Sequence, residues 1–534
     1  MGEHISGQVP SHGSLAILRT SLQKLATTPA GLVMLTIIVS GGIRIVLAWA
    51  VGYGFGEGYY LATARHFALS YFDQPPLSLW IAWAVIKLAG TDPVFVRLPF
   101  ILIFAATTFA MYRLGAMLFG ERAGAWSAIL LNLSPEFTVS VASWLQPDGP
   151  LMLFILLATL AVAHLIFEAP RRPLLTWAAA GAAFGLAFLS KYHAALVLGG
   201  LIIFVLTTRG YRTWFFRPGL LLATLVSLLI ISPVLIWNSQ NQWVSFFFQG
   251  DRIVESASLR IDWLLRNIGG QALIMGVLIW PPLIIVFVRG LLAGSRDVRT
   301  WFLCCLAIIP IILFTIASLW APLGWHFHWQ APGYLFLFPL LGKVVAEQLD
   351  AGLAGTKRWI ASAAGLLFIM VAVVSTQALT GWMRYVFPPA IAAKLGAPAN
   401  PTRELLQWHG LKEALVRNGM IGRPRIFAVA PQWHQVGKVD VQIGDEMPVV
   451  CLCSDPRNIA FSWDTRQFAG WDALIIGTDD YLRDVHATYG NYFRGIEPLD
   501  ELNVFLGDQV DLTVHIYLAH DYYKAFPMTL PPGR

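Results

Sequence analysis

Apolar runs of about 20 residues, long enough to cross the hydrocarbon core of a bilayer as helices, recur along the chain as far as residue 379. No other feature constrains the fold as strongly, because 56% of the 534 residues are hydrophobic and only 13% are charged. A water-soluble core cannot enclose so much apolar surface, so the bilayer must cover a large part of it. We expect a polytopic all-α membrane domain over residues 31–379, with about eleven transmembrane helices near Gly31–Ala50, Leu98–Leu118, Ala123–Val139, Pro150–Phe167, Leu174–Leu189, Ala194–Thr208, Gly219–Trp237, Gln271–Val288, Trp301–Trp320, Ala331–Val345 and Trp359–Leu379.

Basic residues orient these spans, because short cytoplasmic loops of membrane proteins are enriched in Lys and Arg. The N-terminal segment 1–30 carries Arg19 and Lys24, and it lacks a small-residue cleavage pattern, so we expect a retained anchor in the bacterial inner membrane with a cytoplasmic N-terminus. Alternate connections carry further basic residues and are predicted to be cytoplasmic: Arg113 and Arg122; Arg171 and Arg172; Arg209, Arg212 and Arg217; Arg289, Arg296 and Arg299; Lys357 and Arg358.

The segment 380–534 has a different, more polar composition and begins with several prolines, including Pro388, Pro389, Pro398 and Pro401. Short apolar stretches within it are typical of strands: Arg425–Ala430, Val449–Leu452 and Ala473–Gly477. An odd number of spans places this segment outside the cytoplasm. We therefore predict a small periplasmic α/β or α+β domain after the membrane domain.

The net charge of +6 does not indicate nucleic-acid binding, because the basic residues are scattered between apolar runs and form no patch with interleaved aromatics. Cys304 and Cys305 lie in an apolar run, where they are expected to be small core residues. Cys451 and Cys453 are two positions apart in a predicted strand, a spacing that rarely meets disulfide geometry. We expect neither a disulfide nor a metal site from these cysteines.

The first external connection, about residues 51–97, concentrates polar and aromatic side chains. Glu57 lies in a glycine-rich stretch and is followed by Tyr59 and Tyr60, then by Arg65, and later by Asp73 and Gln74. Glycines allow a close approach of the backbone to a substrate. Aromatic rings anchor a chain at the membrane interface and also offer flat faces to a sugar ring. This connection either lines a substrate-binding site or is a solvated loop with an aromatic belt at the membrane interface.

Ionisable residues recur at other predicted external corners, namely Asp148, Lys191, Arg252, His326 and His328. Charged groups at this depth are costly unless they are paired or line a polar cavity, so each is a functional candidate. Lys191 interrupts an otherwise apolar hairpin, and the alternative role for it is a lysine that reaches back to the interface. His326 and His328 could hold a divalent metal, but the ligand set is incomplete without carboxylates.

Several short motifs in a fixed order resemble those of a known family, the bacterial members of the dolichyl-phosphate-mannose–protein mannosyltransferase superfamily, which have the glycosyltransferase C fold. Relatives include the aminoarabinose and galacturonic acid transferases that decorate lipid A. The resemblance extends from about Gly54 to Gly342. It rests on Glu57–Tyr60 with Tyr71–Pro76, Val96–Pro99, Leu118–Gly120, Pro147–Pro150, Leu186–His193 and Pro233–Arg252.

The resemblance implies an inverting glycosyltransferase that moves a sugar from a polyprenyl-phosphate carrier to a glycolipid, polymer or protein acceptor at the periplasmic face. An acid in the first external loop acts on the acceptor hydroxyl as general base, and positive charge stabilises the departing phosphate. The family usually has Asp-Glu where this chain has Gly56-Glu57. Either Glu57 or Asp73 takes the role of base, or the chain has lost or altered activity.

Other roles are also implied by the resemblance. Lys191 matches a basic position that faces the lipid phosphate, with Arg252 and His328 as helpers, and Asp148 matches a second acid that orders the site. Substrate contacts are expected from Tyr59, Tyr60, Arg65, Gln74 and His326, although Gln74 stands where some relatives carry a lysine. A divalent metal remains possible, but no complete ligand set is visible in the sequence.

Two alternatives to the enzyme remain. A lipid-carrier transporter or flippase would explain the spans, but it predicts charged residues threaded through the span centres and broken helices at matching positions in two halves. Here the charged residues gather at one face, which favours an enzyme at the interface. A non-catalytic relative that scaffolds envelope assembly is the third hypothesis, because the usual Asp is missing.

Overall fold

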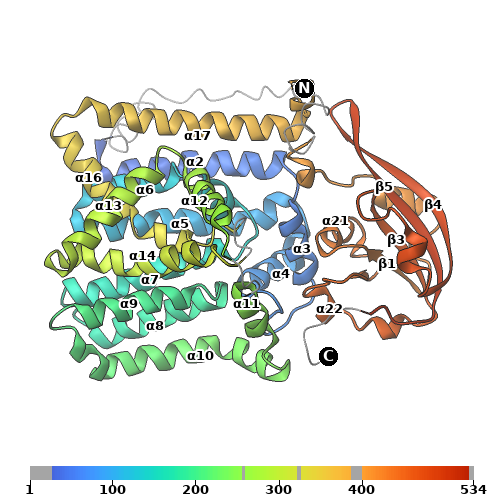
Figure 1. Ribbon diagram of the computed structural model, residues 1–534, viewed down its shortest axis with the longest axis horizontal. Coiled ribbons are helices and arrows are strands. Elements are labelled where there is room, and N and C mark those ends of the chain that lie inside the picture. The colour runs from blue at the N-terminus through green and yellow to red at the C-terminus, as the bar shows by residue number, and fades with distance from the viewer. Residues whose placement is uncertain (1–26, 255–258, 322–325, 387–399, 528–534) are drawn as a thin grey trace, which may run out of the picture.

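Seven helices in the described part of this computed structural model, which comprises residues 27–254, 259–321, 326–386 and 400–527, are long and apolar enough to cross a membrane. They run roughly along the long axis of the molecule (Figure 1). The chain is thus a multi-pass membrane protein. These helices are α2 (Pro29–Ala50), α5 (Pro93–Phe119), α7 (Asp148–Phe167), α8 (Pro173–Ser190), α10 (Pro218–Gln240), α14 (Val298–Ala317) and α17 (Ala354–Thr380).

The predicted count of eleven spans is not confirmed, and the differences have local causes. The run Gln271–Val288 is not one helix: α12 (Ile261–Met275) and α13 (Trp280–Ala293) meet at 109°. Gly276 ends α12 with a φ of 94°, a conformation that favours glycine, and prolines follow at the start of α13. The run Ala331–Val345 is likewise divided, between α15 (Ala331–Leu335) and α16 (Phe338–Asp350).

Shorter elements complete the membrane part. The predicted span Ala123–Val139 consists of α6 (Glu121–Asn132) and a π-helical turn, η1 (Glu136–Val141). The remaining short helices are α3 (Phe55–Ala64), α4 (Leu77–Ala89), α9 (Ala194–Thr207), α11 (Val244–Val254) and α18 (Met383–Val386), with 3-10 turns η2 (Arg212–Phe216) and η3 (Gly294–Arg296). The predicted basic residues Arg19 and Lys24, and the prolines at 388, 389 and 398, lie outside the described residues.

Small residues bring the membrane helices together, as expected where apolar lipid removes the hydrophobic drive for association. Gly115 of α5 and Gly124 of α6 face each other so closely that a Cβ on Gly115 would lie 2.7 Å from the Gly124 Cα. A Cβ on Gly181 of α8 would lie 2.2 Å from the carbonyl oxygen of Ala223 in α10. These contacts hold the bundle that carries the ends of α7 and α8.

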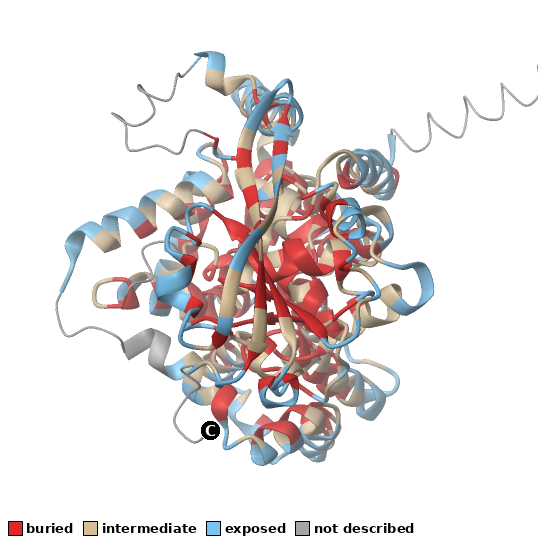
Figure 2. Ribbon diagram, turned by 90° about the vertical axis from the view of Figure 1, so that its right-hand side faces the viewer, coloured by how far each residue is buried: buried red, intermediate tan, exposed pale blue. Residues whose placement is uncertain are grey.

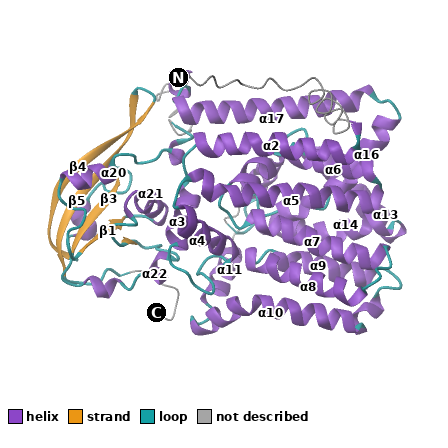
Figure 3. Cartoon of the chain, turned by 180° about the vertical axis from the view of Figure 1, so that it is seen from behind, coloured by secondary structure: helices purple, strands orange, loops and turns teal. Residues whose placement is uncertain are grey.

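The C-terminal domain, described from residue 400 to 527, is built around one mixed sheet of order β2-β1-β3-β5-β4 (Figure 3). The three predicted strands are confirmed as β1 (Ile426–Ala430), β2 (Val449–Cys451) and β3 (Asp472–Thr478), which pair in parallel. The sequence did not single out the long antiparallel hairpin of β4 (Phe493–Leu506) and β5 (Gln509–Tyr522). Helical elements are η5 (Arg403–Leu405), α20 (Leu411–Arg417), α21 (Trp433–Ile443), α22 (Ile459–Ser462), η6 (Thr465–Phe468) and α23 (Val485–Tyr489).

Burial in this sheet explains which strands the sequence revealed. β1 is buried along its whole length, so it reads as an unbroken apolar run. β4 instead alternates between buried, half-buried and exposed residues (Figure 2), and the turn of the hairpin packs against the end of α17 and α18 through Arg384 and Tyr385. Because polar residues interrupt β4, a search for apolar stretches does not find this strand.

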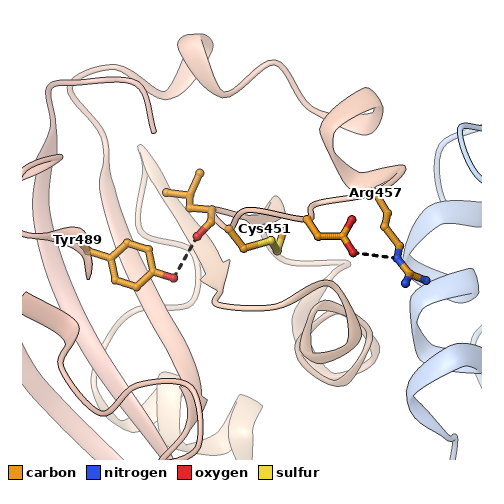
Figure 4. Close-up of a disulfide and its surroundings, with 6 residues drawn as sticks. Cys451, Arg457 and Tyr489 are labelled. Atoms are coloured by element: carbon orange, nitrogen blue, oxygen red, sulfur yellow. Dashed lines mark hydrogen bonds and ion pairs between the residues drawn. A yellow bond between two sulfur atoms is a disulfide. The ribbon is translucent and has the colours of Figure 1, made fainter. Parts of the chain in front are cut away.

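Cys451 and Cys453 form a disulfide, contrary to the expectation from their spacing (Figure 4). The expectation assumed that both cysteines lie on one strand. In the structure β2 ends at Cys451, and Cys453 lies in the bend that follows, with the two Cα atoms 5.5 Å apart. That separation is within the normal range for a disulfide. On the far side of the bend, Arg457 points toward the N-terminal helices (Figure 4).

Candidate active site

The C-terminal domain packs directly on α3, the helix that carries Glu57. Helix α21 crosses α3 at a pair of glycines, where a Cβ on Gly437 would lie 2.0 Å from the carbonyl carbon of Gly58. A Cβ on Gly56, by contrast, would meet nothing within 4 Å. Packing therefore leaves room for a side chain at position 56.

Glu57 is held in a closed network. Its carboxylate is 1% exposed and accepts two hydrogen bonds from Arg97, from Nε at 2.9 Å and from Nη2 at 2.6 Å. The backbone amides of Gly54 and Leu145 donate to the same carboxylate at 3.3 and 3.2 Å. A carboxylate with both oxygens occupied in this way ties the first loop to α5 and to the segment before α7. It is poorly placed to accept a proton from a substrate.

Asp73 lies at the junction of the first loop and the C-terminal domain. Its Oδ1 accepts a 3.0 Å hydrogen bond from the Tyr59 hydroxyl, and that hydroxyl accepts one from the backbone amide of Asn458 at 3.1 Å. The Asn458 side chain in turn accepts from the amide of Phe72 at 2.8 Å. Gln249 of α11 donates to the Asp73 carbonyl oxygen at 2.7 Å. Segments distant in sequence thus fix this acid from several sides.

Asp148 and Lys191 form a buried ion pair. Lys191 Nζ lies 2.9 Å from each carboxylate oxygen of Asp148. Asp148 is the first residue of α7, and Lys191 follows the last residue of α8, so both lie at helix ends that face the C-terminal domain (Figure 1). Paired charges of this kind are the tolerated form of ionisable groups at membrane depth.

Sequence reasoning missed Glu136, which begins η1. It is a buried acid in the neighbourhood of Asp148 and Lys191, and its carboxylate has no hydrogen-bond partner among the described residues. The signal that singled out Lys191, an ionisable residue inside an apolar run, was equally present at Glu136. The residue also lines a cavity of about 780 Å³ together with Gln146 and His328.

The other predicted substrate contacts have different surroundings. Arg65 joins the two parts of the chain, with Nε 2.6 Å from Asp440 and Nη1 2.5 Å from Asp445. Tyr60 and Gln74 are half-buried in the first loop. The side chain of Arg252, in the last turn of α11, lies outside the described part of the structure.

His326 and His328 lie near each other, with ring centroids 6.1 Å apart, and His326 packs against Trp329 at 4.8 Å. Within the described residues there is no group of three or more His, Cys, Asp and Glu side chains that could hold a metal ion. The ligand set that the two histidines would need is therefore not completed here.

Part of the chain is similar to known proteins. Residues 73–237 match the family described as dolichyl-phosphate-mannose-protein mannosyltransferase. The lipid A galacturonosyltransferase RgtD of Rhizobium johnstonii is 24% identical over 265 residues, which are 49% of this chain and 54% of that protein. The undecaprenyl phosphate-alpha-4-amino-4-deoxy-L-arabinose arabinosyl transferase 2 of Proteus mirabilis is 25% identical over 269 residues, 47% of this chain and 46% of that protein. The chain thus spans about half the length of the curated relatives it matches.

The fold is similar over nearly the whole chain to a solved structure. ArnT from Cupriavidus metallidurans, bound to undecaprenyl phosphate, superposes with a TM-score of 0.57 over 91% of this chain and 97% of that one, at 16% sequence identity. At this identity the likeness concerns the fold. Residues 73–237 of the chain are thus similar to this family, and the chain as a whole has a fold similar to that of the solved ArnT structure.

Proposed function

We propose that this protein is an integral membrane glycosyltransferase that moves a sugar from a polyprenyl-phosphate carrier to a cell-envelope acceptor, which is a glycolipid, a polymer or a protein. The observation that carries the proposal is the buried Asp148–Lys191 pair, at the helix ends that face the C-terminal domain and beside a second buried acid, Glu136. The named activities of the two curated relatives, and the carrier phosphate bound by the similar solved structure, support the same chemistry.

The reaction needs a base for the acceptor and a cation for the leaving group. Because the oxygens of Glu57 are already occupied by Arg97 and two amides, we assign the base to Asp73. The acceptor hydroxyl gives its proton to Asp73, its oxygen bonds to the anomeric carbon, and the bond from that carbon to the phosphate oxygen breaks with inversion. The electron pair remains on the phosphate, where Lys191 stabilises it.

The remaining predicted residues have supporting roles in this proposal. Arg252 and His328 assist Lys191 at the phosphate, and Asp148 holds Lys191 in place. Tyr60, Gln74 and His326 contact the substrates. Tyr59 and Arg65 act less directly, because Tyr59 bonds to Asp73 and Arg65 holds the C-terminal domain through Asp440.

We further propose that the N-terminus lies in the cytoplasm and the C-terminal domain in the periplasm of a bacterial inner membrane. The arginine-rich connections at the far end of the helices support this orientation. The disulfide between Cys451 and Cys453 supports it independently, because such bonds persist in oxidising compartments.

One observation favours the transporter alternative, namely the 109° break between α12 and α13. Transporters built from repeats place such breaks at matching positions in two halves. Only one bent pair of this kind occurs among the described residues, so the described part of the chain does not show the matching second break.

The test compares envelope lipids, polymers and proteins by mass spectrometry in a strain without the protein and in strains carrying it or its variants. We expect one hexose, pentose or uronic acid modification to disappear in the deletion strain, and to stay absent with Asp73→Asn or Lys191→Met. A full complement of modifications without the protein would overturn the proposal. Normal transfer by Asp73→Asn at native protein levels would overturn only the assignment of the base.

Site-directed labelling tests the orientation. A membrane-impermeant maleimide should label a cysteine placed at Asp508 in intact spheroplasts, but one placed at Arg171 only after lysis. Labelling at Arg171 in intact spheroplasts would contradict the orientation.

A further inference from the structure

The tip of the β4–β5 hairpin lies against the end of α17, a helix long and apolar enough to cross the membrane (Figures 1 and 3). Gly381 ends α17, and a Cβ on this glycine would lie 2.8 Å from Cγ of Leu506. A Cβ on Gly507, in the hairpin turn, would lie 3.0 Å from the carbonyl oxygen of Thr380. So close an approach of the two backbones holds the hairpin tip and the helix end together.

Polar contacts reinforce this packing. The Tyr385 hydroxyl donates to Asp508 at 2.9 Å, and Arg384 donates to Gln509 at 3.3 Å and to Asp511 at 3.5 Å. Arg384 and Tyr385 belong to α18, the short helix that follows α17. The height of the hairpin tip relative to the membrane is therefore set by the point at which α17 leaves the bilayer.

The composition of α17 locates that point. Lys357 and Arg358 lie near its start, and the stretch from Trp359 to Leu379 contains no charged residue. This stretch is about 30 Å long as a helix, which matches the thickness of the hydrocarbon core. Leu379 consequently lies at the boundary of the core. Gly381 and the hairpin tip lie just beyond it, in the head-group layer, which is roughly 5–8 Å thick on each side of a bilayer.

Apolar side chains at this height point away from the domain. Phe505 and Val510 are direct cross-strand partners, and they are 58% and 46% exposed. A register shift next to this pair separates Val510 from the buried Leu512 and turns it to the exposed side. Helix α18 adds Tyr385 and Val386, which are 60% and 57% exposed. Single exposed apolar residues are common, but a group of them at one edge marks an interaction surface.

The lipid-facing surface of α17 continues toward this group. Val374 and Leu379, in the last turns of α17, are 46% and 51% exposed, and only 6% of the apolar window of this helix is buried. In a bilayer, lipid covers that surface. Two aromatic rings and two valines at the level of the head groups fit the same partner, because amphipathic and aromatic side chains favour this layer.

We propose that the hairpin patch, which consists of Phe505, Val510, Tyr385 and Val386, inserts into the head-group layer of the leaflet on the side of the C-terminal domain. The partner is the phospholipid surface. The insertion is shallow, so the polar residues of the turn stay in contact with the water of that layer. The C-terminal domain is then held at two separate places, at α3 and at the lipid surface. The patch lies outside the candidate site and does not depend on the reaction proposed there.

Spin labelling of the full-length protein in phospholipid nanodiscs tests the insertion. A nitroxide is attached to Val510→Cys, and its relaxation by oxygen, which concentrates in the bilayer, is compared with relaxation by a water-soluble nickel chelate. The native cysteines should not interfere, because Cys304 and Cys305 are buried and Cys451 and Cys453 form a disulfide.

The matched control is Tyr523→Cys, at an exposed residue that follows the opposite end of β5. We expect the ratio of oxygen to nickel relaxation to be several-fold higher at position 510 than at position 523. Equal ratios at the two positions would overturn the proposal.

A photoreactive benzophenone side chain at Phe505 identifies the partner in native membranes. We expect adducts with phospholipid, and few or none from the same side chain at Tyr523. An adduct with another protein in place of lipid would overturn the proposal, since it would make the patch a protein interface. Neither measurement needs sugar transfer. A protein that contacts lipid at Phe505 but transfers no sugar would therefore refute the proposed function alone.

Discussion

Tyr59 donates a 3.0 Å hydrogen bond to Asp73, and its own hydroxyl is held by the backbone amide of Asn458, 399 positions further along the chain. All three residues are almost completely buried. The acid to which we assign the base is therefore positioned partly by the C-terminal domain. Figure 4 shows the neighbouring turn, where the disulfide precedes Arg457.

Removing the Tyr59 hydroxyl should change the titration of Asp73. A hydrogen bond to a carboxylate stabilises its charged form, so Tyr59→Phe should raise the pKa of Asp73. The acid limb of the kcat/KM profile should then move to higher pH, while the alkaline limb stays in place. Measuring transfer against pH checks this. If the acid limb does not move, Asp73 is not the group that accepts the proton, even if the rate falls.

The Glu57–Arg97 pair should matter mainly for folding. Glu57→Gln leaves a buried guanidinium without its counter-charge, which costs about 3–5 kcal/mol when a buried pair is broken. Thermal unfolding in detergent should show a large fall in stability, and the double variant Glu57→Gln/Arg97→Met should recover part of it. A Glu57→Gln protein that is as stable as the native protein but inactive would instead assign Glu57 to catalysis.

Docking of the C-terminal domain should depend on the two glycines where α21 crosses α3. Gly437→Ala places a methyl group 2.0 Å from the backbone of Gly58, which forces the helices apart. Limited proteolysis should then cut the connection between the domains more rapidly. Gly56→Ala is the control, since its methyl group meets open space. Equal protection of both variants would show that the close approach of the helices is not needed for docking.

Lys438 should make stability depend on pH. Burial lowers its pKa to about 7, and its Nζ donates to the carbonyl oxygens of Tyr53 at 2.5 Å and Leu406 at 2.9 Å. The unfolded chain has the ordinary lysine pKa near 10.4, so between about pH 7 and 10 it binds more protons than the folded chain. This group therefore makes the unfolding free energy rise with pH across that window.

Lys438→Met should flatten that rise, as measured by unfolding of the full chain at several pH values. Lys524→Met, at an exposed lysine of the same domain, should leave the slope unchanged. Identical slopes for Lys438→Met and the native protein would mean that this lysine is charged in the folded state throughout the window.

Hydropathy predicted the long spans because a helix surrounded by lipid must be apolar on every side. The predicted span Trp359–Leu379 lies within α17 for this reason. The same measure failed at Gly276, where the run stays apolar although the backbone turns. There the signals for the break were a glycine and the two prolines after it, which hydropathy does not weigh.

The sequence predicted the individual ionisable residues of the candidate site, but not the residues with which they pair. Each of Glu57, Asp73, Asp148 and Lys191 stands out as an ionisable residue in apolar or aromatic surroundings. Their partners do not stand out in the sequence. Arg97 lies 40 positions from Glu57, and Asn458 is an ordinary polar residue of another domain. Such pairings depend on tertiary packing, and our proposal of Asp73 rather than Glu57 as the base rests on them.

The docking of α21 on α3 restricts the directions from which an acceptor can arrive. The C-terminal domain covers the helix that carries Glu57. The contact is made by the backbones of Gly58 and Gly437 and by the Arg65–Asp440 ion pair. If Asp73 is the base, as we propose, the acceptor must reach it past this contact between α21 and α3, so the docking of the C-terminal domain limits the size of the acceptors that can enter.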